Sequence, residues 1–564
     1  MMGLITRESG SEPLSLNVKS EDPYLKYEGK IIRHINLQSL GFDKIVIDTT
    51  RNVESLISHA ANKVHSNTRK SVVRNNLFIR AGKPLNPYRI ADNERTLRNL
   101  PFILDARIYV KPVLDSPDSI DLLVVTRDIF SLGGSVSARI PSVYKVNIKN
   151  VNVGGWGQRA QVGQVFDNDR TPRYGYEAFY QLTNITGSFL DATVAYTKLN
   201  HGISIGNEDE RSVYFKLSRE LYQPFARFAG SIELGDNVSR NVYNKPDSTF
   251  IQYHYSIQDY WMGYSFGYKK MPNNLRENRN RKFIAIRSIE QRFLSPIYVE
   301  LIEPDRFAYR NRLAFLTELT FFRQDFYKTQ YVAGFGRTED IPYGYRISFT
   351  AGWERELANQ RPYAGSVLKY NKVLPSGTIL SYEVKFGGYL KKQHVEDVLF
   401  SANFTRYSKI QRIGRMIVRH RYESGYAALF NQNVKRCLDI RDMNGLIGFK
   451  PDSLIGLQRV TFGNEVTVFT PLKILGFRIA PIARIDLALI KRSAPLFKDN
   501  NLFSGFSLGL LARNENLILN TIGARVYFYP KTVEQVNAFR FNITSNFRIR
   551  YPTNLVNKPA TVFP

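Results

Sequence analysis

The sequence predicts a transmembrane antiparallel β-barrel preceded by a small α+β domain. From about Ser131 to Tyr551, segments of roughly ten residues alternate apolar and polar side chains, as the strands of a membrane barrel do. No run of about eighteen apolar residues occurs, which excludes a helix that spans a membrane. We see no linker in this stretch, whereas a soluble sandwich of this length would normally divide into domains. A closed barrel in lipid needs no such division because it leaves no edge strand.

The last predicted strand shows the alternation most clearly. One face carries Phe539, Phe541, Ile543, Phe547, Ile549 and Tyr551, and the other carries Arg540, Asn542, Thr544, Asn546, Arg548 and Arg550. The same pattern runs through Tyr174–Asn184, Ser212–Ser218 and Ala226–Leu234. A soluble sandwich would alternate in the same way, so the length without a linker is what favours the membrane barrel.

The chain ahead of the barrel has mixed periodicity. The pattern predicts a strand, a helix with an apolar stripe at i, i+4 and i+7 spacing, a second helix opened by a proline, and two more strands. These elements are Ile31–Leu37, the stripe of Val53, Ile57, Ala60 and Val64, the helix from Pro87 to Leu100, and the strands Asp105–Lys111 and Ile120–Thr126. We therefore divide the chain into a flexible N-terminal segment (1–27), an α+β domain (28–129), a barrel (130–551) and a C-terminal tail (552–564).

The formal net charge of +28 raises the question of nucleic-acid binding. However, the Lys and Arg residues are spread along the chain and mostly alternate with apolar residues, without a basic tail or helix. A positive barrel interior, or contacts with anionic lipid headgroups, accounts for the charge at least as well. Nucleic acid is therefore not an expected partner.

No catalytic pattern is found in the sequence. Cys437 is the single cysteine, which excludes an intramolecular disulfide and a thiolate metal cluster. His59 and His65 are six residues apart, off the spacing of a helical metal pair, and there is no nucleophile elbow or phosphate-binding loop. We expect no enzyme activity, no cofactor and no metal, although a Ser and a His on neighbouring strands stay an open alternative. Met1–Arg7 lacks the apolar stretch of a secretory signal, so we expect the export signal to have been removed or to lie upstream.

The first domain resembles a POTRA domain, the periplasmic module of the outer-membrane assembly superfamily that includes BamA, TamA and the two-partner-secretion transporters. The resemblance lies in Val73–Leu85, Glu94–Arg98, Asp105–Val110 and Ile120–Arg127, and in their position just ahead of a barrel. It implies a barrel of about sixteen strands in the outer membrane of a Gram-negative bacterium, with the domain in the periplasm. It covers nearly the whole chain after residue 27.

A second resemblance concerns a loop that folds back into the barrel in this superfamily. The matching segment is Met443–Phe449, and its motif residues are Leu446, Ile447, Gly448 and Phe449. Glu465 and Asp486 match the acidic partners on the strands that follow. Ile447 stands where the superfamily has an Arg, and Ala488 where a Gly is usual. Because Ile447 donates no hydrogen bond, we expect another cation at the two acids, with Arg441 or Arg459 nearest in sequence, or water.

The resemblance also implies a weak seam between the first and last barrel strands, Leu132–Ile140 and Phe539–Tyr551. The seam residues are Gly133, Gly134, Phe539, Phe541 and Phe547. The two glycines can equally mark a turn or bulge. The implied function is assembly or insertion of client outer-membrane proteins without enzymatic chemistry. The alternatives are a scaffold barrel in a multi-protein envelope complex and, third, a transport pore. Partners would then be outer-membrane lipid and either clients or the subunits of such a complex.

Overall fold

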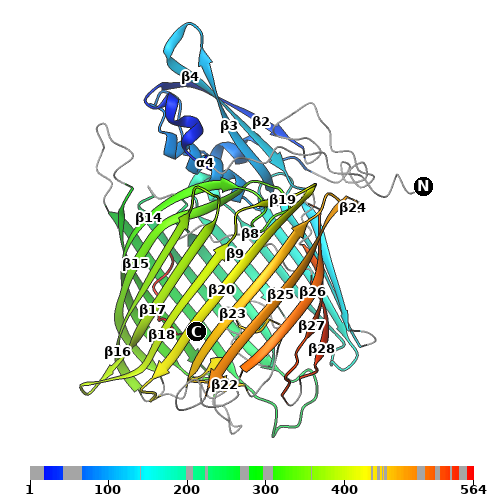
Figure 1. The fold of residues 1–564 in the computed structure, drawn as a ribbon. Helices are drawn as coiled ribbons and strands as arrows, with labels where there is room; N and C mark the ends of the chain where they lie inside the picture. Colours follow the sequence, from blue (N-terminus) through cyan, green and yellow to red (C-terminus); the bar gives the residue numbers. More distant parts are fainter. Residues whose placement is uncertain are drawn as a thin grey trace.

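The structure is a computed structural model in which a barrel carries a small domain at one end (Figure 1). It describes residues 18–41, 66–139, 142–197, 208–222, 226–266, 279–295, 309–356, 359–433, 436–440, 445–447, 449, 454–474, 476–491, 502–514, 521–533, 536–544 and 556–563. Within these ranges, every helix is too short or too polar to cross a membrane.

The N-terminal domain is a three-stranded sheet with two helices in its described part. In the order β2-β4-β3, the central strand pairs in parallel with β2 and antiparallel with β3. The elements are β2 (Ile31–Leu40), α3 (Lys70–Asn75), α4 (Pro87–Asn99), β3 (Ile103–Val113) and β4 (Ser116–Asp128). Asn86 caps α4 by accepting from the Arg89 amide at 3.2 Å. The α+β domain is thereby confirmed, while the stripe from Val53 to Val64 lies outside the described residues.

Residues 18–27, which we expected to be a flexible lead-in, carry two short elements. β1 (Val18–Lys19) pairs with β14 (Arg312–Thr329) of the barrel, and η1 (Asp22–Tyr27) buries Tyr24 in the domain core. The Tyr24 hydroxyl donates to Glu94 Oε2 at 2.6 Å and to the Ile108 carbonyl at 3.0 Å. The burial of Tyr24 and the pairing of β1 with a distant strand hold residues 18–27 in place. The polar local sequence indicates neither contact.

The barrel is an antiparallel sheet in which each strand pairs with the next one along the chain. Its strands are β5 (Leu132–Arg139), β6 (Val143–Val153), β7 (Gln158–Asp167), β8 (Tyr174–Leu182), β9 (Asp191–Thr197), β10 (Asp209–Arg219), β11 (Phe228–Arg240), β12 (His254–Phe266), β13 (Arg281–Phe293), β14, β15 (Glu339–Glu356), β16 (Asn359–Val373), β17 (Ile379–Lys391), β18 (His394–Tyr407), β20 (Met416–Phe430), β23 (Gln458–Phe469), β25 (Phe477–Lys491), β26 (Leu502–Arg513), β27 (Ile522–Phe528) and β28 (Phe539–Thr544). The strand order places β28 next to β5, so that the sheet closes (Figure 1).

The strand count differs from the sixteen that the resemblance implied. The described sheet has 23 strands, of which β1, β19 (Gln411–Ile413) and β24 (Lys473–Ile474) are short additions, leaving twenty in the wall. Outside the wall, η2 (Ile185–Gly187) is a single turn, and β21 (Leu438–Asp439) pairs with β22 (Ile455–Gly456). The connections in the wall differ in length: two residues join β15 to β16, whereas eighteen join β13 to β14. The same length of chain is therefore divided into more strands than expected.

The two faces of the wall have opposite chemistry. On β12, Tyr260, Met262 and Phe266 are exposed on the outside, whereas Asp259 and Ser265 are buried on the inside. The expected apolar faces point outward in the described strands, as Tyr174, Phe215, Phe228 and Phe539 do, whereas Ala226, just ahead of β11, is buried. The largest fully buried side chains are Arg361 and Arg484. Exposed apolar and buried charged side chains reverse the pattern of soluble proteins and are what a barrel in lipid requires.

Candidate functional site in the barrel lumen

The predicted luminal loop packs against the inner wall at the barrel end away from the N-terminal domain. Leu446 and Phe449 are fully buried and form a cluster with Phe503, Tyr527 and Tyr529. The Tyr529 hydroxyl donates to the Ile447 carbonyl at 2.9 Å. The Ile447 side chain is 40% exposed. Gly448, Met443 and Asn444 lie outside the described residues. Apolar packing and a backbone hydrogen bond therefore hold this segment, without an arginine at position 447.

The two acids expected to partner the loop are bound by arginines of the barrel wall. Arg484 Nε donates to Asp486 Oδ1 at 2.8 Å. Glu465 Oε2 lies 3.4 Å from Arg525 Nη1 and 3.9 Å from Arg484 Nη1. A third acid, Glu423, accepts from Arg484 Nη1 at 2.8 Å. Arg484 is therefore shared by three carboxylates, an arrangement that neutralises charges in a buried site.

The cations are thus different from those expected from the sequence. Arg459 Nη1 donates to the Asp439 carbonyl, and Arg441 lies outside the described residues. Arg484 stands two residues before Asp486, so both side chains point to the same face of β25. That spacing was a local signal for this partner. Arg525 reaches Glu465 from β27, 60 residues further along the chain, and no local pattern indicates it.

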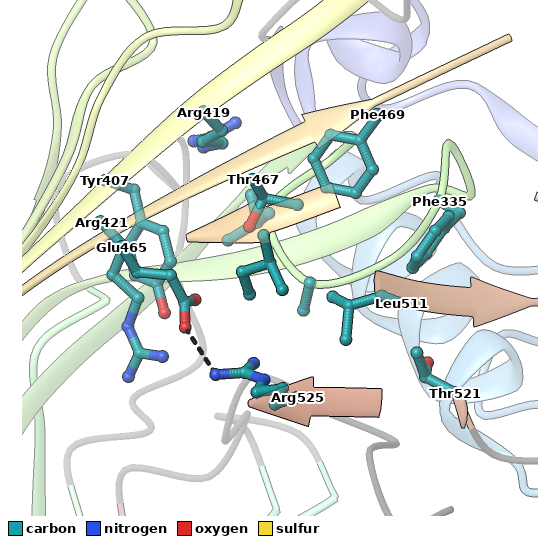
Figure 2. Close-up of a pocket in the computed structure, with 13 residues that line it drawn as sticks. Phe335, Tyr407, Arg419, Arg421, Glu465, Thr467, Phe469, Leu511, Thr521 and Arg525 are labelled. Atoms are coloured by element: carbon teal, nitrogen blue, oxygen red, sulfur yellow. Dashed lines mark hydrogen bonds and ion pairs between the residues drawn. The ribbon is translucent and has the colours of Figure 1, made fainter. Parts of the chain in front are cut away.

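A small cavity lies beside this cluster, toward the N-terminal domain (Figure 2). Its volume is about 90 Å³, and its polar lining includes Arg419, Arg421, Glu465 and Arg525. This volume would hold about three water molecules at roughly 30 Å³ each. Glu465 therefore has both an arginine partner and room for water, which is the second environment that we expected for the acids.

The seam residues lie on the strands that end the sheet. Gly133 and Gly134 pair with Lys149 and Ile148 in regular register with β6, so neither glycine marks a turn or bulge. A Cβ atom at Gly134 would lie 2.8 Å from the Asn147 carbonyl oxygen, which explains the absence of a side chain there. Phe539 and Phe541 are exposed on the outer face of β28, and Phe547 lies outside the described residues.

The luminal and seam residues stay apart in the fold. The strands β26 and β27 separate β25, which carries Asp486, from β28. The structure therefore brings together the loop and the wall that carries its acids, but it does not bring the seam residues to this cluster.

The sequence did not point to the contact between α4 and the domain-side mouth of the barrel. Arg98 Nε and Nη2 donate to the two oxygens of Asp340 at 2.9 and 2.7 Å. Arg98 also pairs with Glu94, which in turn pairs with Lys328 of β14. The Arg95 guanidinium lies 4.0 Å from the centre of the Phe326 ring. Four of these side chains, Arg98, Glu94, Asp340 and Lys328, thus form one buried network between the domain and the barrel rim.

The carboxyl groups at this contact have pKa values that are shifted in opposite directions. Burial alone would raise the pKa of Glu94, but Lys328, Arg98 and Arg107 outweigh it and hold that pKa well below its usual value. Burial raises the pKa of Asp92, despite Arg279 and Arg95 nearby. Burial also raises the pKa of the Glu21 carboxyl to about 7. The contact therefore contains both fixed and titratable charges.

A loop of the barrel also covers this mouth. Residues 330–338, which join β14 to β15, reach strands on the other side, where Phe335 packs against Ile417, Phe469 and Ala480. Arg107 of the domain donates to Thr338 Oγ1 at 2.7 Å. The domain and this loop are therefore in contact at this end of the barrel.

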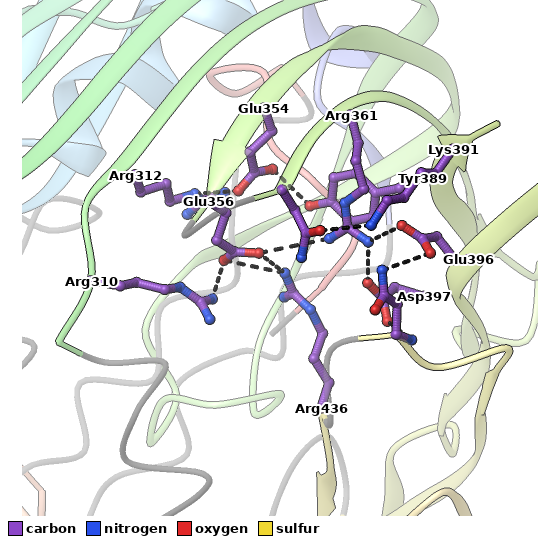
Figure 3. A network of polar contacts seen from close by, with 12 residues as sticks. Arg310, Arg312, Glu354, Glu356, Arg361, Tyr389, Lys391, Glu396, Asp397 and Arg436 are labelled. Atoms are coloured by element: carbon purple, nitrogen blue, oxygen red, sulfur yellow. Dashed lines mark hydrogen bonds and ion pairs between the residues drawn. The ribbon is translucent and has the colours of Figure 1, made fainter. Parts of the chain in front are cut away.

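At the opposite end, a second charged network lines the lumen (Figure 3). Arg361 pairs with Glu396 at 2.8 Å and with Asp397. Arg436 lies 3.1 Å from Glu356, and the Tyr389 hydroxyl donates to Glu354 at 2.7 Å. In the described part of the chain, no group of three or more His, Cys, Asp or Glu side chains is placed to hold a metal ion.

Comparisons with known proteins found matches among solved structures. No protein-family model matches the chain, and no curated protein matches it. A crystal structure of BamA from Haemophilus ducreyi, lacking POTRA domains 1–3, is 11% identical, with a TM-score of 0.33 over 90% of this chain and 84% of that one. CdiB from Acinetobacter baumannii is 10% identical, with a TM-score of 0.40 over 92% and 74%. CdiB from Escherichia coli is 10% identical, with a TM-score of 0.43 over 92% and 75%.

Proposed function

We propose that this chain is an outer-membrane barrel of the assembly superfamily that its sequence resembles, and that it assembles or inserts other outer-membrane proteins. The N-terminal domain would lie in the periplasm. The observation that supports this most is the pairing of the first and last barrel strands, since β28 lies next to β5 in the sheet. Opening the barrel there separates two strands that are far apart along the chain and leaves the connections between consecutive strands in place.

The mechanism needs no catalytic residue. Opening the seam exposes the backbone N–H and C=O groups of β5 and β28, which an incoming client strand satisfies by pairing with them. The outer faces of both strands are already suited to lipid, so the client strand meets the membrane directly. The domain sheet offers β2 and β3 as edge strands for the same kind of pairing before insertion.

A reversible lock on the seam tests this proposal. After Cys437→Ser, cysteine pairs are placed across β5 and β28 and scanned over register, because a disulfide needs a Cα separation of roughly 4.4–6.8 Å. The locked protein is reconstituted in liposomes, and folding of a client barrel is followed by its heat-modifiable migration on gels. We expect oxidation to stop client folding and reductant to restore it. Client folding that is unchanged in a crosslinked sample would overturn the proposal.

A scaffold barrel in a multi-protein envelope complex is the second candidate. The observation that favours it is the buried network at α4, since ion pairs such as Arg98–Asp340 hold the domain on the barrel mouth. Depletion in the native organism separates the two functions. Loss of many outer-membrane proteins supports the insertase, and loss of a single partner complex supports the scaffold.

A further inference from the structure

Residues 556–563, which we call the luminal tail, run inside the barrel. We propose that the luminal tail is an internal peptide ligand, and that the track it fills on the inner wall is a binding site for an extended peptide with a basic residue five positions before an aromatic one. An incoming client segment of this chemistry would displace the tail. Only the identity of this outside ligand rests on the proposed function.

The luminal tail follows the length of the lumen. Val556 packs with Phe283 and Phe322, near the domain-side ends of β13 and β14. At the other end, Val562 packs with Leu399 and Leu429 of β18 and β20. Since these strands are not neighbours, the tail crosses the wall instead of pairing with one strand. Val556, Pro559 and Val562 are its buried residues, and a spacing of three suits an extended polyproline II chain.

The basic residue of the tail sits in an acidic pocket of the wall. Lys558 Nζ donates to Asp259 Oδ2 and lies 3.9 Å from Glu233 Oε2. Next to it, Arg287 Nη1 donates to the Pro559 carbonyl at 2.8 Å. Arg287 also donates to both oxygens of Asp259, at 2.7 and 2.8 Å. The pocket therefore recognises a cation and the following carbonyl together.

The aromatic residue of the tail is held between two tyrosines and an arginine. The Phe563 ring stacks on Tyr389 with centroids 5.5 Å apart and an angle of 13°, and meets Tyr363 edge-on at 6.4 Å. Arg436 lies 4.5 Å from the centre of the same ring. The Val562 amide donates to the Tyr363 hydroxyl at 2.8 Å. Tyr389 and Arg436 belong to the network of Figure 3.

Three polar side chains of the wall that contact the tail also have partners on the wall itself. Asp259 keeps Arg287 as a partner, Glu233 keeps Lys216 at 3.6 Å, and Tyr389 keeps Glu354. Removing the tail would therefore leave no uncompensated charge on these three side chains. Because these side chains keep their partners when the tail is absent, the track is preformed. Another peptide can therefore replace the tail.

Peptide binding to the purified full-length barrel tests this inference. The probe is a fluorescent synthetic peptide with the sequence of residues 556–563, measured by anisotropy in detergent. Two variants open the track: truncation after residue 555, and Lys558→Glu in the full chain, which places like charges against Asp259 and Glu233. Lys392→Glu in the exposed turn after β17 is the matched charge control. Heat-modifiable migration verifies that each barrel is folded.

We expect the probe to bind both opened variants and to bind the native chain and Lys392→Glu at least tenfold more weakly. A probe carrying Lys558→Ala and Phe563→Ala should lose about tenfold or more in affinity for the opened variants, because it lacks the charged contact and the ring contact. Absence of binding to folded opened variants, or equal binding to the native chain, would overturn the inference. No client is present in this measurement, so its failure is distinct from a failure of insertion.

Discussion

The N-terminal domain and the luminal loop are held against the barrel by different kinds of contact. At the domain end, α4 is held by a network of buried charges in which Arg98 serves both Glu94 and Asp340. At the far end, Leu446 and Phe449 are held by apolar packing against the wall. Losing one member of a buried charge network leaves its partners unpaired, whereas losing an apolar contact leaves only a cavity. The α4 contact should therefore respond to single substitutions more strongly than the luminal loop does.

The largest effect is expected from Arg98→Ala. It leaves Asp340 without its bidentate partner, and breaking a buried pair in this way costs about 3–5 kcal/mol. Docking of the domain should weaken, seen as faster proteolysis of residues 66–129 and a lower unfolding temperature. Arg33→Ala is the control, since the Arg33–Asp121 pair is on the surface, where solvent screens the attraction, and its loss should change little. Equal effects of the two variants would show that the buried Arg98–Asp340 pair contributes no more than the surface pair.

Phe449→Ala should have the next largest effect. The fully buried ring packs against Phe503 and Tyr529, and its loss costs about 3 kcal/mol, near the low end for this substitution because the cluster borders the lumen. The loop should be nicked faster by protease between Arg441 and Arg459, with the domain contact unchanged. Ile447→Ala in the same loop is the control and should change little. A loop that resists protease equally in both variants would contradict the packing.

The domain end should also depend on pH through Glu21. Its pKa is raised from 4.5 to about 7, so the folded form binds the proton more tightly than the unfolded form. The contribution of Glu21 to stability is then greatest below pH 4.5 and is lost as the pH rises to 7. Thermal unfolding at pH 5 and pH 8 should differ less in Glu21→Gln than in the native chain. Glu28→Gln, at an exposed position, should keep the native difference.

Ile447→Arg is expected to have the smallest effect. Asp486 and Glu465 already have Arg484 and Arg525 as partners, and Leu446 and Phe449 already hold the loop. Protease nicking between Arg441 and Arg459 should change by less than about twofold. Ile447→Leu is the control for side-chain size. Much slower nicking in the arginine variant would show that the acids still lack a cation.

The luminal site was only partly visible in the sequence. Leu446 and Phe449 are buried against the inner wall, and the identity of this segment with the loop of the superfamily stays a prediction. The sequence analysis did not identify Arg484 as the cation that pairs with Asp486, although Arg484 stands two residues away on the same strand face. The contact of Arg98 with Asp340 spans 242 residues, and Lys558 meets Asp259 across 299. Such pairs have no local pattern because they depend on which strands the fold brings together.

The barrel and the direction of its faces follow from the local sequence pattern. Successive side chains of a strand point to opposite sides, so the apolar face of each segment is a local property that can be read residue by residue. The number of strands, the buried network at α4 and the course of the luminal tail depend on the tertiary structure. These depend on closing the sheet around a shared interior, where the free energy comes from groups far apart along the chain.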